Sequence, residues 1–324
     1  MKAIIWPRYG APEVMQLQEV DQPVPKDQEI LVKIHAATVT AGDCEMRRFD
    51  LPGWIWLFAR LYMGIRQPRH KRLGQEFSGV IAAVGKKVTQ YTSGDAIFAD
   101  TGMHLGAYAE YLCLAASHAI APKPSNMTFE EAATIPTGGM NALHFLRMAK
   151  VQPGEKVLIN GAGGSIGTYG VQIARLWGAE VTVVDTAAKL EMLRDLGADH
   201  AIDYTKEDFT QNGQSYDVII DVVGACSFSR CIQALKSKGR LVLGNPRLGG
   251  MMRGVWTSVT SDKKVLFALA EGTTKDYNLL REWIEAGHLK SVIDRSYALD
   301  QIVEAHHYVE AGHKAGNVVI KISE

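Results

Sequence analysis

Residues 156–167 (KVLINGAGGSIG) narrow the choice of folds for this chain more than any other segment. A short apolar run, Val157 to Ile159, has the length of a buried strand and ends in a cluster of glycines. Apolar residues then recur near helical spacing from Thr168 to Trp177, so the glycines lie at a strand-to-helix turn. At such a turn the backbone can approach a diphosphate, and the first N–H groups of the helix face the anion at the positive end of the helix dipole.

A second strand after this helix favours a dinucleotide site. Val181 to Val184 is apolar and ends at Asp185, which lies 18 residues after Gly167. A carboxylate about 20 residues beyond the glycines is the usual partner of the adenosine ribose. The alternative is a tight turn in an α/β domain that binds no nucleotide. We predict that the turn lines a dinucleotide diphosphate, through Gly163, Gly164, Ser165, Ile166 and Gly167.

Strands and helices alternate through the rest of the middle of the chain. Strands are expected at 216–221, 240–244 and 265–269, and helices at 227–235 and 277–286. This alternation predicts a doubly wound parallel sheet, in which ligands bind at the carboxyl ends of the strands. Before residue 125, short strands separated by turns with Gly and Pro predict a small β-rich domain. The chain returns to short strands after residue 287, and we expect it to rejoin that first domain.

The charge balance and the small number of cysteines exclude several classes of function. Lys plus Arg and Asp plus Glu each total 35 among 324 residues, so no net field attracts nucleic acid or another polyanion. Four cysteines are too few for a disulfide scaffold and match no metal-site spacing, which predicts a reducing, cytoplasmic setting. The first residues lack the apolar core of a secretory signal, and no segment reaches the roughly 20 apolar residues that span a bilayer. We therefore expect no nucleic-acid partner and no stable membrane insertion.

The segment from Leu51 to Arg72 joins an aromatic and aliphatic block to a basic block. One interpretation is an amphipathic helix packed on the β-rich domain, with a solvated basic end. Another is a hydrophobic lid over a substrate pocket, since binding loops carry exposed aromatic residues. The third is peripheral membrane contact, which we favour less because the basic residues form one block and do not line a helix face.

Motifs along nearly the whole chain resemble one known family. In chain order they are Leu73–Gly79 (LGQEFSG) with Val84 and Gly85, Gly94–Phe98 (GDAIF), Gly106–Tyr111 (GAYAEY), Asn160–Gly167, Leu196–Asp199 (LGAD) and Gly312–Val319 (GHKAGNVV). Their order and spacing are far more specific than the glycine turn alone. The chain resembles the medium-chain dehydrogenases/reductases, in the zinc-free, quinone oxidoreductase-like branch.

This resemblance implies an α/β fold in two domains. A GroES-like, β-rich catalytic domain would comprise residues 1–125 and 288–324, and it would enclose a Rossmann dinucleotide-binding domain at 126–287. The resemblance also implies a homodimer, formed through the edge of the Rossmann sheet near Val265 to Leu269.

The resemblance allows a comparison with the catalytic metal site of zinc-bearing relatives. Thr40, Gln75 and Thr137 stand at the aligned positions of the zinc ligands, and none supplies the thiolate, imidazole or carboxylate that zinc prefers. Glu76 follows Gln75, but one carboxylate cannot hold the ion. The region of the structural zinc lobe contains a single cysteine, Cys113. We therefore expect a protein without zinc or another bound metal.

Without a Lewis acid, hydride transfer suits an acceptor that is already activated. In a quinone or an α,β-unsaturated carbonyl, conjugation disperses the developing negative charge, and one or two hydrogen-bond donors suffice for the enolate oxygen. The expected activity is an NAD(P)H-dependent quinone or enone oxidoreductase. Asp43 is interpreted as a structural or hydrogen-bonding residue, a role that a raised pKa in a dry pocket would change. The candidate catalytic donors are Thr40, Gln75 and Thr137, with Tyr62 interpreted mainly as a packing residue.

The signals for the nicotinamide cofactor conflict. Asp185 would accept hydrogen bonds from a ribose diol and repel a 2′-phosphate, which favours NAD(H). Thr186, Lys189 and Tyr204 align with the positions at which NADPH-using relatives hold that phosphate, although Ala188 replaces their usual arginine. We favour NADP(H), with NAD(H) as the alternative. At the nicotinamide end of the cofactor the resemblance implies contacts from Thr137, Val223, Gly224, Asn245 and Asn317.

Two other functions stay open. The first is a nucleotide-binding family member with little turnover that acts as a structural or lipid-associated protein, because a fold does not fix a function. The hydrophobic block at 51–63 supports this alternative. The second is an enoyl-thioester reductase, in which Arg66 to Arg72 would bind the phosphates of an acyl carrier.

Overall fold

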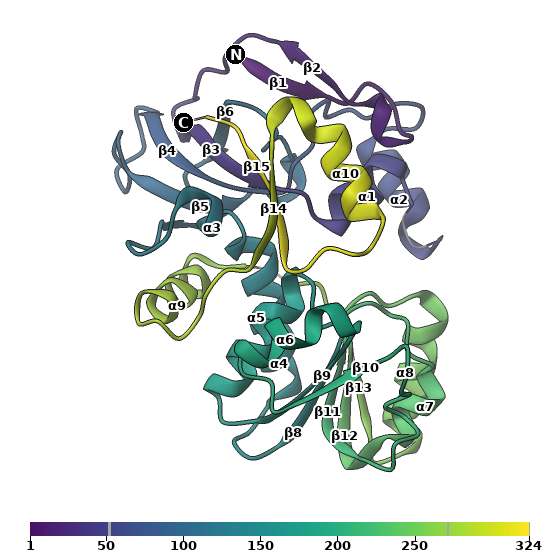
Figure 1. The fold of residues 1–324 in the computed structure, drawn as a ribbon. Helices are drawn as coiled ribbons and strands as arrows, with labels where there is room; N and C mark the ends of the chain where they lie inside the picture. The colour runs from purple at the N-terminus through teal and green to yellow at the C-terminus, as the bar shows by residue number, and fades with distance from the viewer. Residues whose placement is uncertain (51–52, 271, 324) are drawn as a thin grey trace. The chain divides into compact units, whose positions relative to one another are not determined.

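The computed structural model describes residues 1–50, 53–270 and 272–323. The chain divides into two compact units (Figure 1). Unit 1 comprises Met1–Thr137, Gly272–Gly287 and Ser291–Glu324, and unit 2 comprises Gly138–Glu271 and His288–Lys290. Residues 126–137 and 272–287, which we expected in the nucleotide-binding domain, therefore belong to unit 1, and residues 288–290 belong to unit 2.

A six-stranded sheet forms the centre of unit 2. Its strands are β8 (Lys156–Asn160), β9 (Glu180–Asp185), β10 (His200–Asp203), β11 (Tyr216–Asp221), β12 (Leu235–Leu243) and β13 (Lys264–Leu266). They lie in the order β10-β9-β8-β11-β12-β13, and all neighbouring pairs are parallel. The predicted doubly wound parallel sheet is confirmed. Its strand order switches direction between β8 and β11, which is where such sheets bind nucleotides.

Helices connect the strands of unit 2 and cover both faces of the sheet. They are α4 (Met140–Ala149), α5 (Ser165–Leu176), α6 (Ala187–Asp195), α7 (Phe228–Gln233) and α8 (Leu248–Thr260). In Figure 1, α5 and α6 lie on one side of the sheet and α7 and α8 on the other. Leu158, Val183 and Ile219 are accordingly fully buried. Strands covered on both faces have continuous apolar sequences, which explains the runs that predicted them.

A mainly antiparallel sheet and a separate strand pair form the framework of unit 1. The strands are β1 (Lys2–Ile5), β2 (Gln16–Glu19), β3 (Glu29–Thr38), β4 (Glu76–Val84), β5 (Ala96–Asp100), β6 (Tyr111–Ala115), β7 (Ile120–Pro122), β14 (Ile293–Ala298) and β15 (Asn317–Lys321). The main sheet has the order β14-β15-β3-β4-β5-β7, with β6 also paired to β3, while β1 pairs with β2. Trp6, Phe77 and Tyr108 are buried in its core. The expected return of the C-terminal residues to this domain is confirmed by β15, which pairs with β3.

Short helices complete unit 1 and carry its candidate site residues. They are the 3₁₀ turns η1 (Pro12–Val14), η2 (Gly102–His104) and η4 (Leu299–Gln301), the π-helical turn η3 (Ile135–Gly139), and α1 (Ala41–Arg48), α2 (Gly53–Met63), α3 (Phe129–Ala132), α9 (Thr274–Glu285) and α10 (Ile302–Glu310). Capping boxes begin α1 at Thr40, α3 at Thr128 and α9 at Thr273. Within the described ranges, no helix has both the length and the hydrophobicity needed to cross a bilayer.

The position of α9 differs from the prediction. Its periodicity indicated a helix that would complete the nucleotide-binding domain, but α9 packs in unit 1. The Tyr277 hydroxyl donates to Asp100 at 2.5 Å, and the Asn126 amide donates to the Ile284 carbonyl at 2.9 Å. An amphipathic pattern shows which face of a helix is buried, but it does not show against which sheet.

A disulfide between Cys226 and Cys231 was not anticipated. Cys226 lies just before α7 and Cys231 lies within it, and this local turn brings their Cα atoms to 6.6 Å, within the range for a bridge. The pairing depends on the fold of the segment, which the spacing of five residues did not disclose. Cys44 and Cys113 are free.

Candidate active site

The glycine turn of unit 2 has the geometry of an anion-binding helix start. It leaves β8 at Asn160 and enters α5 at Ser165, with Gly164 as an N-cap residue that makes no side-chain capping bond. The N-cap residue therefore places no side chain over the first backbone N–H groups of α5, as at the helix starts that bind anions. A Cβ atom on Gly167 would lie 2.4 Å from the Ala162 backbone, so only glycine allows α5 to pack this closely on the turn.

Asp185 and Lys189 meet at the edge of this turn. The Gly163 backbone N–H donates to Asp185 Oδ2 at 2.7 Å, and the Thr186 N–H donates to Oδ1 at 2.8 Å. The Lys189 ammonium lies 3.2 Å from Oδ1, with both side chains nearly buried. Asp185 thus holds the glycine turn in shape, and its negative charge is balanced by Lys189.

The remaining residues assigned to the adenosine end lie around this ion pair. The Tyr204 N–H donates to the Asp185 carbonyl at 3.2 Å, and its ring is 58% exposed. The Thr186 hydroxyl lies 3.5 Å from Asp185 Oδ1. The structure therefore brings together Asp185, Thr186, Lys189 and Tyr204, which were assigned to the adenosine end of the cofactor, and places them beside Gly163 of the predicted diphosphate turn.

Val223, Gly224 and Asn245 gather at the carboxyl ends of β11 and β12. A Cβ atom on Gly224 would lie 3.3 Å from the Asn245 carbonyl oxygen, which shows how closely the two loops approach. Val223 is 55% exposed and Asn245 is also exposed. Both are open to a ligand at this edge of the sheet.

The sequence analysis missed two residues that support this edge. The Asn160 amide donates to Asp221 Oδ1 at 2.9 Å, and the Gly224 N–H donates to the same oxygen at 3.1 Å. Burial raises the pKa of Asp221, against the lowering effect of these donors. The available signal was their position, because Asp221 ends a predicted strand, Asn160 directly follows one, and each stands before a glycine-containing loop.

In unit 1, α1 and β4 bring Thr40 and Gln75 together. The Thr40 hydroxyl lies 2.8 Å from Gln75 Oε1 and 2.6 Å from Asp43 Oδ2. Asp43 also accepts from the Thr40 N–H at 2.9 Å and closes the capping box of α1. Burial raises the pKa of Asp43 to about 6, although its bonds with Thr40 act in the opposite direction. Asp43 is thus the hydrogen-bonding residue that we expected, but with the raised pKa that would permit a further role.

Glu76 links Thr137 to this group. Its carboxylate accepts from the Thr137 backbone N–H at 2.5 Å and from the Thr38 hydroxyl. Glu76 is fully buried, and burial raises its pKa to about 7, while the Thr38 and Thr137 donors act against the shift. Thr137 is therefore joined to Glu76, the residue next to Gln75 in the sequence.

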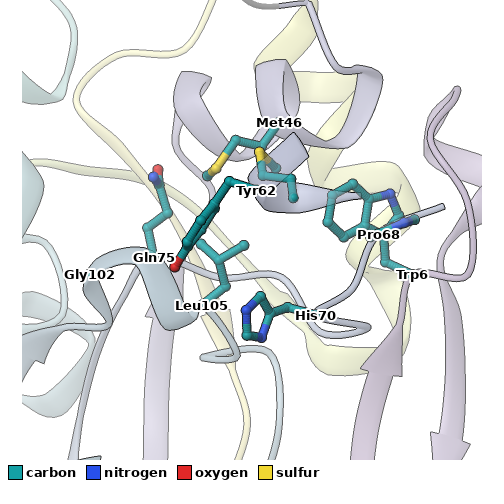
Figure 2. A pocket seen from close by; sticks show the side chains of 9 residues that line it. Trp6, Met46, Tyr62, Pro68, His70, Gln75, Gly102 and Leu105 are labelled. Atoms are coloured by element: carbon teal, nitrogen blue, oxygen red, sulfur yellow. The ribbon is translucent and has the colours of Figure 1, made fainter. Parts of the chain in front are cut away.

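A pocket of about 360 Å³, its open mouth included, lies beside Gln75 in unit 1 (Figure 2). Its lining is mostly apolar: Trp6, Met46, Tyr62, Met63, Pro68, His70, Gln75, Gly102 and Leu105. In Figure 2 the side chains of Tyr62 and Leu105 lie toward Gln75, while Trp6 and Pro68 close another part of the wall. A mostly apolar pocket with a few polar side chains suits a small conjugated molecule.

The structure combines two of the interpretations of the 51–72 segment. Leu51 and Pro52 lie outside the described residues, and α2 follows them. Met63 is buried and Ala59 packs on the domain core, as expected for a helix packed on the domain. Tyr62 and Met63 also line the pocket, as expected for a lid.

Asn317, which the resemblance assigned to the nicotinamide end of the cofactor, belongs to unit 1. It is the first residue of β15 in unit 1, it is buried, and its amide donates to the Val292 carbonyl at 3.0 Å. Its Oδ1 has no partner among the described residues.

Comparison with known proteins identifies the family. The model described as "Alcohol dehydrogenase GroES-like domain" matches residues 26–125, and the model described as "Zinc-binding dehydrogenase" matches residues 196–320. A 2-methylene-furan-3-one reductase from Solanum lycopersicum is 30% identical, over 99% of this chain and 79% of its own. A chloroplastic NADPH-dependent alkenal/one oxidoreductase from Arabidopsis thaliana is 29% identical with the same coverage. The chain belongs to the medium-chain dehydrogenase/reductase superfamily.

A solved structure supports the same assignment. The quinone oxidoreductase from Coxiella burnetii matches with a TM-score of 0.89 and 28% identity, over 100% of this chain and 99% of that chain. This medium-chain dehydrogenase/reductase is therefore quinone oxidoreductase-like, as the motifs indicated. Its predicted fold class, a GroES-like domain and a Rossmann-like parallel sheet, is confirmed.

The metal site of zinc-bearing superfamily members has no counterpart in the residues that we aligned with its ligands. Thr40, Gln75 and Thr137 offer hydroxyl and amide groups, and Glu76 is committed to Thr38 and Thr137. Over the part of the chain that the structure describes, no three His, Cys, Asp or Glu side chains are grouped so that they could hold an ion. The donor set in this superfamily member does not fit zinc.

Proposed function

We propose that this protein is an NAD(P)H-dependent oxidoreductase that transfers a hydride to a quinone or an α,β-unsaturated carbonyl without a metal ion. Unit 2 would hold the cofactor by its diphosphate at the start of α5, and the apolar pocket of unit 1 would hold the acceptor. The observation that carries the proposal is the Gln75 amide on the wall of this pocket. The activities named for the relatives above support the class of acceptor.

The hydrogen bonds around Gln75 assign its role. Oε1 lies 2.8 Å from the Thr40 hydroxyl, whose single proton it shares with Asp43 Oδ2, whereas Nε2 donates to no other described residue. The amide nitrogen is therefore the free donor for a substrate oxygen. Hydride addition to the β-carbon of an enone places negative charge on the carbonyl oxygen. A fixed hydrogen-bond donor beside that oxygen stabilises the enolate. Thr40 and Thr137 then act mainly by holding Gln75 and Glu76 in place.

This assignment explains why a metal is unnecessary. A quinone or enone distributes the charge through conjugation, so a neutral donor can take the place of the Lewis acid that a simple carbonyl would need. Inductively coupled plasma analysis of the purified protein tests this part of the proposal. Stoichiometric zinc that is retained after dialysis would overturn it.

For the cofactor we favour NADPH. Lys189 balances the Asp185 charge that would repel a 2′-phosphate, and both carboxylate oxygens of Asp185 already accept backbone N–H groups. Thr186 and Tyr204 lie beside this pair and can donate to phosphate oxygens. We expect Lys189→Ala to weaken NADPH binding about tenfold and NADH binding much less, since only NADPH carries the 2′-phosphate. Equal losses for both nucleotides, measured by fluorescence titration, would show that Lys189 does not read the phosphate.

One assay separates this function from the two alternatives. The protein is mixed with NADPH or NADH and with a quinone, a small enone, a 2-alkenal or an enoyl thioester, and the absorbance of the reduced cofactor is followed. Oxidation with the quinone or the enones supports the proposal. Oxidation with the thioester alone indicates an enoyl-thioester reductase. Tight cofactor binding without oxidation by any acceptor indicates a structural or lipid-associated protein.

We also propose a homodimer formed along β13. This strand is at the edge of the unit 2 sheet, and α8 beside it exposes Met252, Val255, Trp256 and Val259, each more than half exposed. A second copy that extended the sheet would cover these side chains. Light scattering should give twice the mass of the chain for the natural protein and the single mass for Trp256→Asp. A monomeric natural protein would contradict this proposal.

A cytoplasmic location is the last part of the proposal. It is supported by the low number of cysteines, whereas the Cys226–Cys231 disulfide weighs against it. Cell fractionation together with thiol labelling tests it. Recovery of the protein in an oxidising compartment with this disulfide intact would contradict it.

A further inference from the structure

The exposed face of α2 is a large apolar surface, of which Tyr62 alone also lines the proposed acceptor pocket. Five side chains of the helix, with Ile65 just after it, leave large apolar areas in solvent: Trp56 41%, Leu57 59%, Phe58 72%, Leu61 51%, Tyr62 46% and Ile65 64% exposed. Figure 1 shows α2 beside α1 at the periphery of unit 1. A cluster of this size on a soluble domain marks an interaction surface.

The opposite side of α2 is fixed to the domain, so this exposure belongs to the folded state. The Arg60 guanidinium lies 3.9 Å from the centre of the Phe49 ring and 4.5 Å from that of Tyr9. The Tyr9 hydroxyl donates to the Gly64 carbonyl at 2.9 Å, and the Arg69 N–H donates to the Met63 carbonyl at 2.7 Å. These contacts hold the helix and the turn after it in one orientation.

The charge around this face has one sign. Residues 51–75 contain five Lys or Arg residues and no Asp or Glu, although the whole chain has 35 of each charge. Arg66 and Arg69 are exposed, and neither has an ion-pair partner among the described residues. The Arg60 guanidinium, by contrast, packs on the rings of Tyr9, Phe49 and Trp56. The free cations therefore border the apolar face.

We propose that α2 and the turn up to Arg69 form a docking surface for an anionic lipid bilayer. Apolar side chains that enter the acyl boundary, aromatic rings at the headgroup level and cations beside them are the features of interfacial helices. The contact is peripheral, since α2 has only 11 residues. The basic block does not need to line a helix face, because the turn carries Arg66 and Arg69 beside the apolar residues.

Other occupants fit the charge less well. A two-fold contact with a second copy through this surface would place the same acid-free, cationic segments against each other, which like-charge repulsion opposes. An anionic bilayer supplies both the apolar layer and the negative charge over the whole face. The same segment also lines the pocket, through Tyr62, Met63, Pro68 and His70. This face therefore lies next to the proposed acceptor pocket.

The test is cosedimentation of the full-length protein with large vesicles, made either of phosphatidylcholine alone or of phosphatidylcholine mixed with phosphatidylglycerol. We expect binding to the mixed vesicles at low salt and release at high salt. The double variant Phe58→Ser/Leu61→Ser should lose at least tenfold in partitioning. Arg66→Gln/Arg69→Gln should lose about fivefold per removed charge on mixed vesicles only.

Matched controls use exposed residues elsewhere in unit 1. Val24→Ser removes an apolar side chain that is 84% exposed, and Lys86→Gln/Lys87→Gln removes two surface charges. Both should bind vesicles like the natural protein, and circular dichroism and thermal unfolding should show that all the variants fold. The proposal is wrong if the natural protein stays in the supernatant with both vesicle types, or if the controls lose as much binding as the α2 variants. A dimer that Phe58→Ser/Leu61→Ser converts to a monomer would instead assign the surface to a second copy.

Discussion

Two groups of polar side chains in unit 1 begin on the same helix and have opposite character. The pocket cluster consists of Thr38, Thr40, Asp43, Gln75, Glu76 and Thr137. The sealed cluster consists of Cys44, Arg47, His306 and Glu310, with the Gly10 carbonyl. Asp43 and Cys44 are neighbours in α1, yet one faces the first cluster and the other the second. The first cluster ends at a pocket, while the second joins α1 to α10 and to the loop at Gly10.

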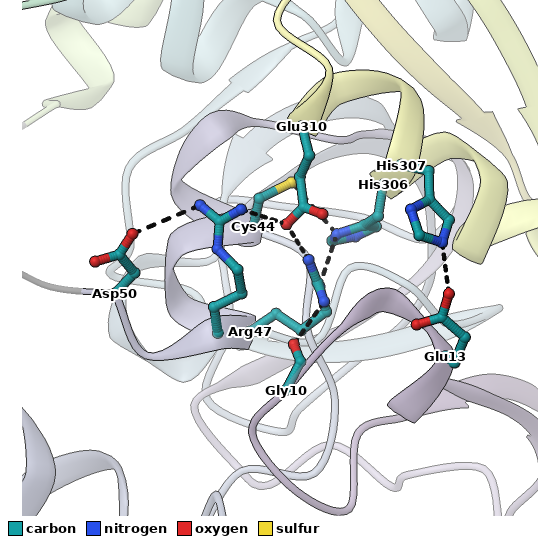
Figure 3. A network of polar contacts seen from close by, with 9 residues as sticks. Gly10, Glu13, Cys44, Arg47, Asp50, His306, His307 and Glu310 are labelled. Carbon is teal, nitrogen blue, oxygen red and sulfur yellow. Dashed lines mark hydrogen bonds and ion pairs between the residues drawn. The ribbon is translucent and has the colours of Figure 1, made fainter.

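In the sealed cluster the buried charge is matched. Arg47 is fully buried, and its guanidinium pairs with Glu310 and donates to the Gly10 carbonyl at 2.6 Å and to His306 Nδ1 at 3.3 Å (Figure 3). Burial lowers the pKa of His306 to about 3, with a further contribution from the Arg47 charge. The histidine is therefore neutral and can accept from Arg47. Such a cluster fixes the positions of three segments of unit 1.

In the pocket cluster the two buried carboxyl groups have hydroxyl and amide donors but no cation among their described partners. Their pKa values are raised, by burial first, to about 6 for Asp43 and about 7 for Glu76. This arrangement costs stability but leaves the Gln75 amide free at the pocket wall. The cluster whose buried carboxyl groups have no cationic partner among the described residues is therefore the one that reaches the pocket wall.

The largest effect is expected from breaking the sealed cluster. Arg47→Met should lower the free energy of unfolding by about 3 kcal/mol, because it leaves the Gly10 carbonyl and His306 without their donor. Arg48→Met is the matched control, since Arg48 also pairs with Glu310 but is 41% exposed and should cost less than about 1 kcal/mol. Urea unfolding measures both variants. Equal midpoints for the two would show that burial of Arg47 adds nothing to the strength of its pairing with Glu310.

The next effect is on activity and not on stability. Gln75→Leu should lower kcat/KM for a quinone or enone about 100-fold, because it removes the donor to the enolate oxygen. The dissociation constant for NADPH and the urea midpoint should change little. Met46→Leu, which alters the pocket wall without removing a donor, should stay within about threefold of the natural protein. If both variants lose activity equally, pocket shape and not the amide sets the rate.

A smaller loss is expected when Gln75 is kept but its support is removed. Thr40→Val should lower kcat about tenfold, since Oε1 of Gln75 loses the hydroxyl that orients the amide. It should also cost about 1 kcal/mol, because Thr40 caps α1. Thr40→Ser keeps both hydrogen bonds and should restore rate and stability. Loss of stability without loss of rate would limit Thr40 to capping.

The two clusters should give opposite dependences of stability on pH. The unfolded Glu76 has a pKa near 4.5 and the folded one near 7, so the folded state binds the extra proton between these values and stability falls as the pH rises. His306 has the reverse relation, because its pKa of about 6.5 in the unfolded chain drops to about 3, so stability is lost as the pH falls below about 6.5. Each group contributes at most about 1.4 kcal/mol per pH unit.

Two variants test this difference in the pH dependence of stability directly. Relative to the natural protein, Glu76→Gln should make the slope of unfolding free energy against pH more positive between pH 5 and pH 6.5. His306→Gln should make it less positive over the same range. Urea titrations at several pH values measure both slopes. A change of the same sign in both variants would contradict the assigned protonation states.

We expect no effect from removal of metal ions. Chelation with EDTA followed by dialysis should leave both the urea midpoint and kcat unchanged, because neither cluster offers a zinc ligand set. The sealed cluster has one thiol and one imidazole, 3.4 Å apart, and burial raises the pKa of that thiol to about 12. A loss of activity that zinc restores would place a metal in the pocket cluster after all.

The local sequence pattern was sufficient to predict many of the strands and helices of this protein. The run from Val157 into the glycines sufficed to predict β8, the turn and α5, because a buried parallel strand and a tight entry into a helix require those residue types in that order. The alternating segments predicted the parallel sheet, and the motifs predicted the family and the aligned trio Thr40, Gln75 and Thr137.

Only the tertiary structure decided which residues meet and what their environment does to them. The packing of α9 in unit 1, the Cys226–Cys231 bridge and the exposed faces of α2 and α8 depend on contacts between segments distant from each other or on local geometry that spacing does not encode. Asp185 and Lys189, which gave conflicting signals for the cofactor, form an ion pair with each other. The raised pKa values of Asp43 and Glu76 arise from desolvation, and desolvation is a property of the assembled core that no single segment of sequence contains.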